Sequence, residues 1–148
     1  MTEKKEYRVA EKVLSGYVKN VNEAQKLMME VSRLRDVGDI HAQSYEVNHG
    51  SGGVSDPVAS YVYRLMSVEH KLARLLRRIA VVDMLRGDLL AGNVITNTSP
   101  KNLLLVLDMY YISGFTVSEV VRFLRWSRSI FYVRRNELVS LTGEYLRG

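Results

Sequence analysis

The chain has 148 residues, of which 47% are hydrophobic and 25% are charged, and its formal net charge is +5. This balance is typical of one globular domain, or of a small core with an appended module, and argues against a disordered chain. The absence of cysteine excludes disulfides, thiolate zinc sites and cysteine nucleophiles. No apolar run is long enough to cross a membrane, and no secretory signal is visible, so we expect a cytoplasmic protein.

Two long helices are predicted for the first part of the chain. The first is expected over residues 3–37 without a break at Gly16, and the second over residues 57–90, with Pro57 in its first turn. In the first helix an apolar residue recurs every three or four positions, at Tyr7, Ala10, Leu14, Tyr17, Val21, Ala24, Met28 and Val31. Neither helix can bury such a face alone. We therefore expect the two to form an antiparallel hairpin.

Residues 38–55, between the two helices, are predicted to form a flexible linker with a glycine-rich centre at 50–53. A phosphate-binding loop is the alternative for this segment. It is disfavoured because no strand precedes the glycines and no Lys-Ser/Thr pair follows them.

A basic stripe runs along the second predicted helix, at Arg64, Lys71 and Arg78. A contact with a nucleic-acid backbone is one interpretation. Basic residues beside an apolar face more often pair with acids of a neighbouring helix, here Glu23 or Glu30, and we favour that interpretation.

A polar segment over 92–98 separates these helices from a carboxy-terminal module. We expect a helical scaffold and oligomerisation region at 1–92 and a DNA-binding module at 99–148. The module has seven Lys and Arg residues and four acidic ones. Its first helix is predicted over 102–113 and is stopped by Gly114.

Two further helices complete the predicted module. A Thr-x-x-Glu capping box at 116–119 begins a short helix over 117–124, and Ser127 begins a third helix over 128–146. A short second helix, a tight turn and a capped third helix form a helix-turn-helix, the third helix of which enters the major groove of DNA. The candidate DNA-binding residues are Arg125, Ser127, Arg128, Ser129, Tyr132, Val133, Arg135 and Asn136.

Arg125 departs from the usual composition of this turn, in which a glycine adopts a left-handed conformation. A residue with a side chain costs about 1–2 kcal/mol in that conformation. The angle between the second and third helices of the module therefore depends on whether Arg125 adopts the left-handed conformation.

The segments from Tyr111-Ile112-Ser113-Gly114-Phe115-Thr116 to Ser127-Arg128-Ser129-Ile130-Phe131-Tyr132 resemble the sigma-region-4-like helix-turn-helix of phage transcriptional regulators of the ArpU/RinA type. A weaker similarity extends over about two-thirds of the chain. The resemblance implies sequence-specific binding of double-stranded DNA near late promoters, activation of phage or prophage genes in a bacterial host, RNA polymerase as a partner, and no cofactor.

Two other functions fit the same pattern. A small terminase subunit, which recognises DNA for packaging, also joins a helix-turn-helix to long helices, and a purely structural helical protein with an acidic protein partner is the third alternative. No catalytic constellation is visible, so we do not expect an enzyme, and three dispersed histidines are a weak metal signal. Partly covered apolar side chains on a two-helix layer favour a homodimer.

Overall fold

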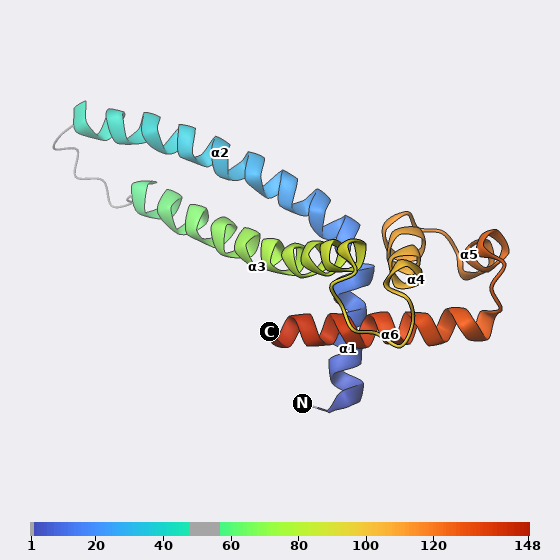
Figure 1. The fold of residues 1–148 in the computed structure, drawn as a ribbon. Helices are drawn as coiled ribbons and strands as arrows, with labels where there is room; N and C mark the ends of the chain where they lie inside the picture. Colours follow the sequence, from blue (N-terminus) through green and yellow to red (C-terminus); the bar gives the residue numbers. More distant parts are fainter. Residues whose placement is uncertain (1, 48–56) are drawn as a thin grey trace. The chain divides into compact units, whose positions relative to one another are not determined.

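The computed structural model describes residues 2–47 and 57–148, and the side chains of these residues except 39–47 and Pro57 (Figure 1). These residues form helices and contain no strand, which confirms the all-α class. No helix among them is long and apolar enough to span a membrane. The elements are α1 (Glu3–Ser15), α2 (Tyr17–Val47), α3 (Pro57–Ala91), α4 (Pro100–Leu105), the π-helix η1 (Val106–Ile112), α5 (Val117–Leu124) and α6 (Arg128–Arg147).

The predicted first helix is interrupted at Gly16, so the expectation of an unbroken helix was wrong. The N–H of Gly16 still donates to the carbonyl of Lys12 at 2.9 Å, but its backbone angles, φ −89° and ψ 0°, leave the helical range. The Ser15 hydroxyl donates to the carbonyl of Glu11 at 2.7 Å, a bond that bends helices. The Ser15 hydroxyl competes with backbone N–H groups for the carbonyl of Glu11, and Gly16 has no side chain. Together these two features end α1.

Helix α2 continues to Val47, whereas residues 38–47 were predicted to belong to a linker. Gly38 allows a close approach within the helical pair. A Cβ at this position would lie 2.2 Å from the ring of Tyr61, so only glycine leaves room for that ring where it stands. The glycine-rich centre of the predicted linker lies outside the described residues.

The chain divides into two compact units, one of residues 1–20 and 77–148 and one of residues 21–76. We call them the core unit and the hairpin unit. This division differs from the predicted boundary between 1–92 and 99–148. The first turns of the chain and the end of α3 belong with the carboxy-terminal helices, because α4, η1, α5 and α6 alone have too little apolar surface to bury.

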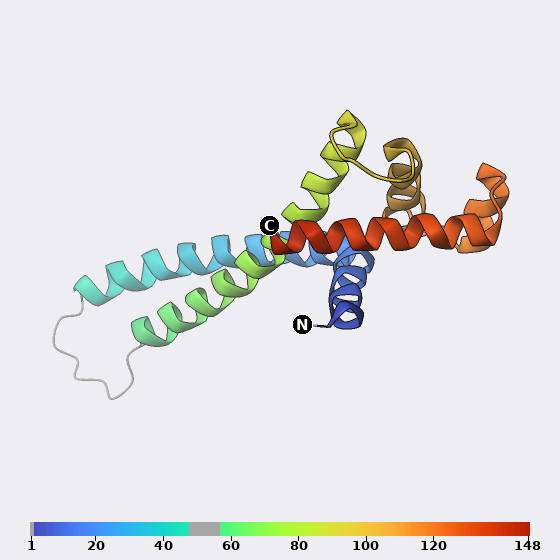
Figure 2. The same ribbon diagram turned by 60° about the horizontal axis from the view of Figure 1, so that its bottom comes forward.

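In the hairpin unit, α2 and α3 lie side by side (Figures 1 and 2). Ion pairs of Glu30 with Arg64 and of Glu23 with Lys71 show that the helices are antiparallel, because the residue number falls along one as it rises along the other. These pairs confirm the interpretation as a helix flank for Arg64 and Lys71, whereas Arg78 belongs to the core unit. Among the described side chains of α2 in this unit, Ala24, Leu27, Val31 and Leu34 are buried, whereas Met28 is exposed, contrary to the predicted seam.

The core unit is built around one apolar cluster to which α1, α3, α4, η1, α5 and α6 contribute. Its fully buried large side chains are Leu14, Val82, Leu85, Leu103, Val106, Leu107, Val120, Phe131, Leu138 and Val139. Helix α1 packs against α6 and η1. The wide π-helical turns of η1 place Asp108 where its carboxylate accepts two hydrogen bonds from Arg86 of α3, at 2.8 and 3.0 Å.

Two tyrosines tie other elements of the core unit to the end of α3. The Tyr17 hydroxyl donates to Asp83 at 2.6 Å, and the Tyr145 hydroxyl of α6 donates to Asp88. The hydrogen bond to Asp83 raises the pKa of Tyr17 from its ordinary value of 10.0 to about 12. Burial and the hydrogen bond to Asp88 raise the pKa of Tyr145 to about 12.

These two pKa shifts predict a loss of stability in alkali. Tyrosines in the unfolded chain ionise near pH 10, before the same groups in the folded protein, so the stabilisation is complete below pH 10 and is lost as the pH rises through 12. Thermal unfolding followed by circular dichroism from pH 10 to 12 checks this. The double variant Tyr17→Phe, Tyr145→Phe should start less stable but decline less steeply, and an unchanged slope would contradict the assignment.

Candidate nucleic-acid interface

The start of α5 is fixed by a reciprocal pair of hydrogen bonds. The N–H of Glu119 donates to the Thr116 hydroxyl at 3.2 Å, and the N–H of Thr116 donates to the Glu119 carboxylate at 3.3 Å. This capping box was predicted from the sequence and is confirmed. Val120 is fully buried one position later, so α5 is held both at its end and along one side.

The end of α5 is a left-handed turn at Arg125, with φ 58° and ψ 39°. Among the described residues Arg125 is the only non-glycine residue with a positive φ. The N–H groups of Arg125 and Trp126 both donate to the carbonyl of Val121, which closes the helix end. The chain therefore adopts the conformation that glycine usually provides, and it does so with an arginine.

The start of α6 is capped and anchored within four residues. The Ser127 hydroxyl accepts from the N–H of Ile130 at 3.1 Å, as predicted. Phe131 is fully buried and contacts Tyr110 edge to face, with ring centroids 5.3 Å apart. The guanidinium carbon of Arg134 lies 4.3 Å from the ring centroid of Trp126, so Arg134 covers the turn from outside.

The opposite side of α6 is exposed in its amino-terminal half. Ser129, Tyr132, Val133 and Asn136 are all exposed, and Val133 is 64% exposed. The side chains at 129, 132, 133 and 136 follow helical spacing, so they share one side of α6. The four residues predicted for direct contact with bases thus lie together at the surface.

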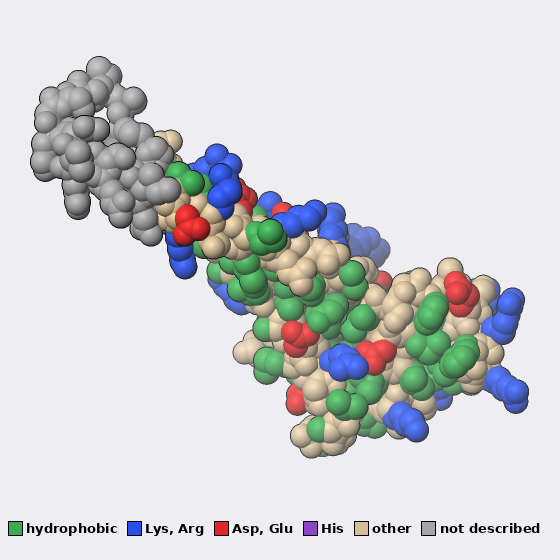
Figure 3. Space-filling view, turned by 90° about the horizontal axis from the view of Figure 1, so that it is seen from above, with side chains coloured by type: hydrophobic (Ala, Val, Ile, Leu, Met, Phe, Trp, Pro, Cys, Tyr) green, Lys and Arg blue, Asp and Glu red, His purple; other side chains and the backbone are tan. Residues whose placement is uncertain are grey.

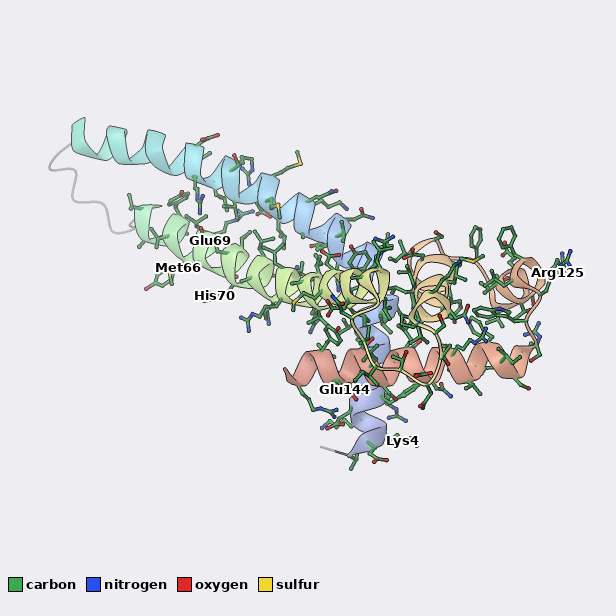
Figure 4. The ribbon with its side chains drawn as sticks, in the orientation of Figure 1. Lys4, Met66, Glu69, His70, Arg125 and Glu144 are labelled. Atoms are coloured by element: carbon green, nitrogen blue, oxygen red, sulfur yellow. The ribbon has the colours of Figure 1, made fainter. Side chains whose placement is uncertain are left out.

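Three exposed arginines lie at the end of α5, in the turn and at the start of α6. Arg122, Arg125 and Arg128 are exposed, and none of them forms an ion pair with a carboxylate of the described residues. Arg128 donates to the Ser118 hydroxyl at 2.6 Å, which links the start of α6 to α5. Figure 4 shows Arg125 projecting outward at the turn, and in Figure 3 Lys and Arg side chains protrude at this end of the core unit.

Arg135 differs from its predicted position at the border of the exposed face. It is half-buried, its guanidinium donates to the Tyr7 hydroxyl at 3.3 Å, and its Nε is buried without a hydrogen-bond partner. The guanidinium carbon also lies 5.1 Å from the ring centroid of Tyr132. Arg135 therefore points toward α1 and supports Tyr132 from behind, which leaves it poorly placed for a phosphate.

The sequence placed Tyr7 of α1 in an apolar repeat and not at the candidate site, yet Tyr7 contacts two of the candidate residues. Its hydroxyl donates to Oδ1 of Asn136 at 2.7 Å while accepting from Arg135. Neighbouring Glu11 accepts from the Tyr111 hydroxyl at 2.6 Å, and burial together with this bond raises the pKa of Tyr111 far above its ordinary value. Tyr7 follows the apolar period of the first helix, which gives no sign of the helix it will meet.

Among the side chains that the structure describes, at 2–38 and 58–148, no three His, Asp or Glu groups lie together in a way that could hold a metal ion. The chemistry available at the exposed face is hydrogen bonding, apolar contact and positive charge.

The strained turn generates a prediction about stability. Arg125→Gly should raise the free energy of unfolding by about 1 kcal/mol, because glycine adopts the left-handed conformation without a Cβ clash. The matched control Arg122→Gly removes the same charge from a helical position in the last turn of α5 and should lower the free energy of unfolding by up to about 1 kcal/mol. Chemical denaturation of both variants measures the difference. Equal effects of the same sign would show that the turn is not strained.

Comparison of the chain with known proteins finds no matching family model, no similar curated protein and no similar solved structure. The resemblance to ArpU/RinA-type regulators therefore depends on the sequence motifs alone.

Proposed function

We propose that residues 116–147 form a helix-turn-helix in which α6 enters the major groove of double-stranded DNA, and that the protein is a transcription regulator similar to the ArpU/RinA type. One observation supports this most strongly. Two capped helices meet at a closed turn and leave one side of the amino-terminal half of α6 exposed, near three arginines that pair with no carboxylate of the described residues.

The exposed side chains match the chemistry of base edges. The Ser129 hydroxyl can donate and accept, Tyr132 offers a phenol and an aromatic face, and the Val133 methyl groups suit the methyl group of thymine. In helix-turn-helix proteins the residues near the start of the recognition helix contact the bases. Ser129, Tyr132 and Val133 lie in the first two turns of α6, at the required end.

The arginines provide affinity that does not depend on sequence. Arg122, Arg125 and Arg128 come from the end of α5, the turn and the start of α6, so they surround the point where the helix would meet the duplex. Each phosphate that such a residue neutralises releases counterions and steepens the dependence of binding on salt. Ser127 remains a capping residue in this proposal.

Asn136 has a more restricted role than its exposure suggests. An asparagine that reads adenine uses its carbonyl oxygen and its amide nitrogen together. Oδ1 of Asn136 already accepts one hydrogen bond from Tyr7, so a two-bond contact with adenine has to use the second lone pair of that oxygen. We assign Tyr7 a positioning role, in which it holds Asn136 and Arg135 at the edge of the recognition surface.

We further propose that the regulator acts as a homodimer in the cytoplasm of the bacterial host, where two copies of α6 would read paired half-sites one helical turn apart. Activation of late genes is the form of regulation that the resemblance implies. The surface for the second copy is taken up below.

Selection of bound duplexes from a random pool by the full chain tests the assigned face and supplies the target. We expect an enriched sequence. For that sequence, Tyr132→Ala with Asn136→Ala should weaken specific binding at least tenfold, since each lost base contact costs about 1–3 kcal/mol. The control Tyr63→Ala with Asn22→Ala makes the same changes at exposed positions of the hairpin unit and should have no effect. Equal binding by all three proteins would show that the face is wrong.

If the arginines contact phosphates, they should increase the dependence of DNA binding on salt concentration. Arg122→Ala and Arg128→Ala should each weaken specific and non-specific binding alike and reduce the slope of log affinity against log salt by about 1. Arg33→Ala, an exposed arginine of the hairpin unit, is the control and should leave the slope unchanged. Fluorescence anisotropy at several salt concentrations gives the slopes. If the control matches the two test variants, the binding is a general effect of net charge.

A further inference from the structure

The two flanks of the hairpin unit differ in chemistry. On one flank, Glu23 pairs with Lys71 at 3.5 Å and Glu30 pairs with Arg64 at 3.3 Å, so ionic groups close the seam between α2 and α3. On the other flank, the described side chains form one ion pair, between Arg35 and Glu69 at 2.9 Å. Helical spacing places these two sets of residues on opposite sides of the pair.

The second flank exposes apolar side chains. Met28, Val62, Met66 and Leu76 are 39–49% exposed, well above what burial in the hairpin would leave. A groove of about 370 Å³ runs beside them between the helices, lined by Met28, Val31, Ser32, Arg35, Asp36 and Leu72. Contiguous exposed apolar surface of this kind marks a site of association with another protein surface.

The apolar residues of α3 stand on both sides of Glu69. Val62 stands seven residues before it and Leu76 seven residues after it, while Met66 precedes it by three and Ala73 follows it by four. Figure 4 labels Met66 and Glu69 on this helix. Turning the helix end over end about Glu69 places Val62 on Leu76 and Met66 on Leu72 and Ala73, so the stripe is self-complementary except at Glu69, which falls on itself. Self-complementarity is what a two-fold interface demands of one surface.

We propose that this flank binds a second copy of the chain, with the two α3 helices antiparallel and a two-fold axis near Glu69. Val62 then meets Leu76 of the second copy, and Met66 meets Leu72 and Ala73 of the second copy. Each Glu69 is neutralised by its own Arg35, so the axis has no net charge. The proposal identifies the surface of the homodimer proposed above, but it depends on no property of the DNA-binding face.

The charges on this flank do not suit a nucleic acid. Among the described side chains of this flank, Arg35 is paired with Glu69, and the exposed carboxylate of Asp36 lies in the groove and forms no ion pair with another of these side chains. Apolar side chains beside a carboxylate match another apolar protein surface better than they match a row of phosphates.

Sedimentation of the full chain without DNA over a range of concentrations tests the proposal first. We expect a monomer–dimer equilibrium whose dissociation constant rises about 100-fold in Met66→Glu, roughly tenfold for each of the two copies of the buried change. Met29→Glu makes the same substitution at an exposed position of α2 that helical spacing places away from the flank, and should leave the dissociation constant unchanged. A monomer at every concentration, a ring of many subunits, or equal effects of both variants would overturn the proposal.

Disulfide trapping provides a second test that does not rely on a disruptive change, since the chain has no cysteine of its own. Glu69→Cys, at the axis, should form a covalent dimer under mild oxidation, whereas Tyr63→Cys, which lies off the stripe, should not. A mixture of Val62→Cys and Leu76→Cys should form mixed dimers faster than either forms dimers with itself. Trapping through Tyr63→Cys alone, or preferential Val62–Val62 dimers, would exclude the antiparallel arrangement.

The two proposals fail separately. A protein that dimerises through α3 but selects no DNA sequence refutes the proposed function and leaves this surface intact. A monomer that still selects one duplex refutes the surface and leaves the DNA-binding face intact.

Discussion

The burial of one side of α6 is the constraint on which the rest of the site depends. Phe131, Leu138, Val139, Leu141 and Thr142 are all buried, over nearly three turns of a single helix. A helix anchored at so many points cannot rotate about its axis without exposing several large side chains, at roughly 1.5–3 kcal/mol each. The residues on the other side, among them Ser129, Tyr132 and Val133, are therefore held outward by the core rather than by contacts of their own.

Helix α1 limits how much of that outward side is available. It packs across α6 from the middle of that helix onward, where Tyr7 bonds Asn136 and Arg135 and, farther along, Glu6 pairs with Arg147 at 2.8 Å. Over the first two turns of α6 the outward side stays exposed. The two parts of α6 therefore differ in role. Its carboxy-terminal part holds the core unit together, and the outward side of its amino-terminal part is free to bind a partner.

Features determined by neighbours in the sequence were predictable. The capping box at Thr116 and the cap at Ser127 each depend on a few adjacent residues, and the structure has both. The sequence left open whether Arg125 adopts the left-handed turn, and the structure shows that it does. The exposed positions of Ser129, Tyr132 and Val133 followed from helical periodicity. The proline at 57 marked the start of α3.

Features determined by distant contacts were not predictable. Leu27 and Met28 both fit an apolar helical period, and only the position of α3 decides that Leu27 is buried and Met28 exposed. The attachment of α1 to α6, and with it the inward position of Arg135, depends on residues more than 120 positions apart. The end of α1 at Gly16 and the extension of α2 to Val47 depend on packing and on local hydrogen bonds. Helix propensities, which differ little between most residues, do not predict them.

The most direct test of the central claim is a titration of the isotopically labelled full chain with its selected duplex, followed by backbone amide signals in NMR. We expect the largest shifts for residues 118–133, at the start of α5, the turn and the first turns of α6. The amide signals of the hairpin unit should not shift. Shifts concentrated on residues 21–76, with α5 and α6 unaffected, would contradict the claim.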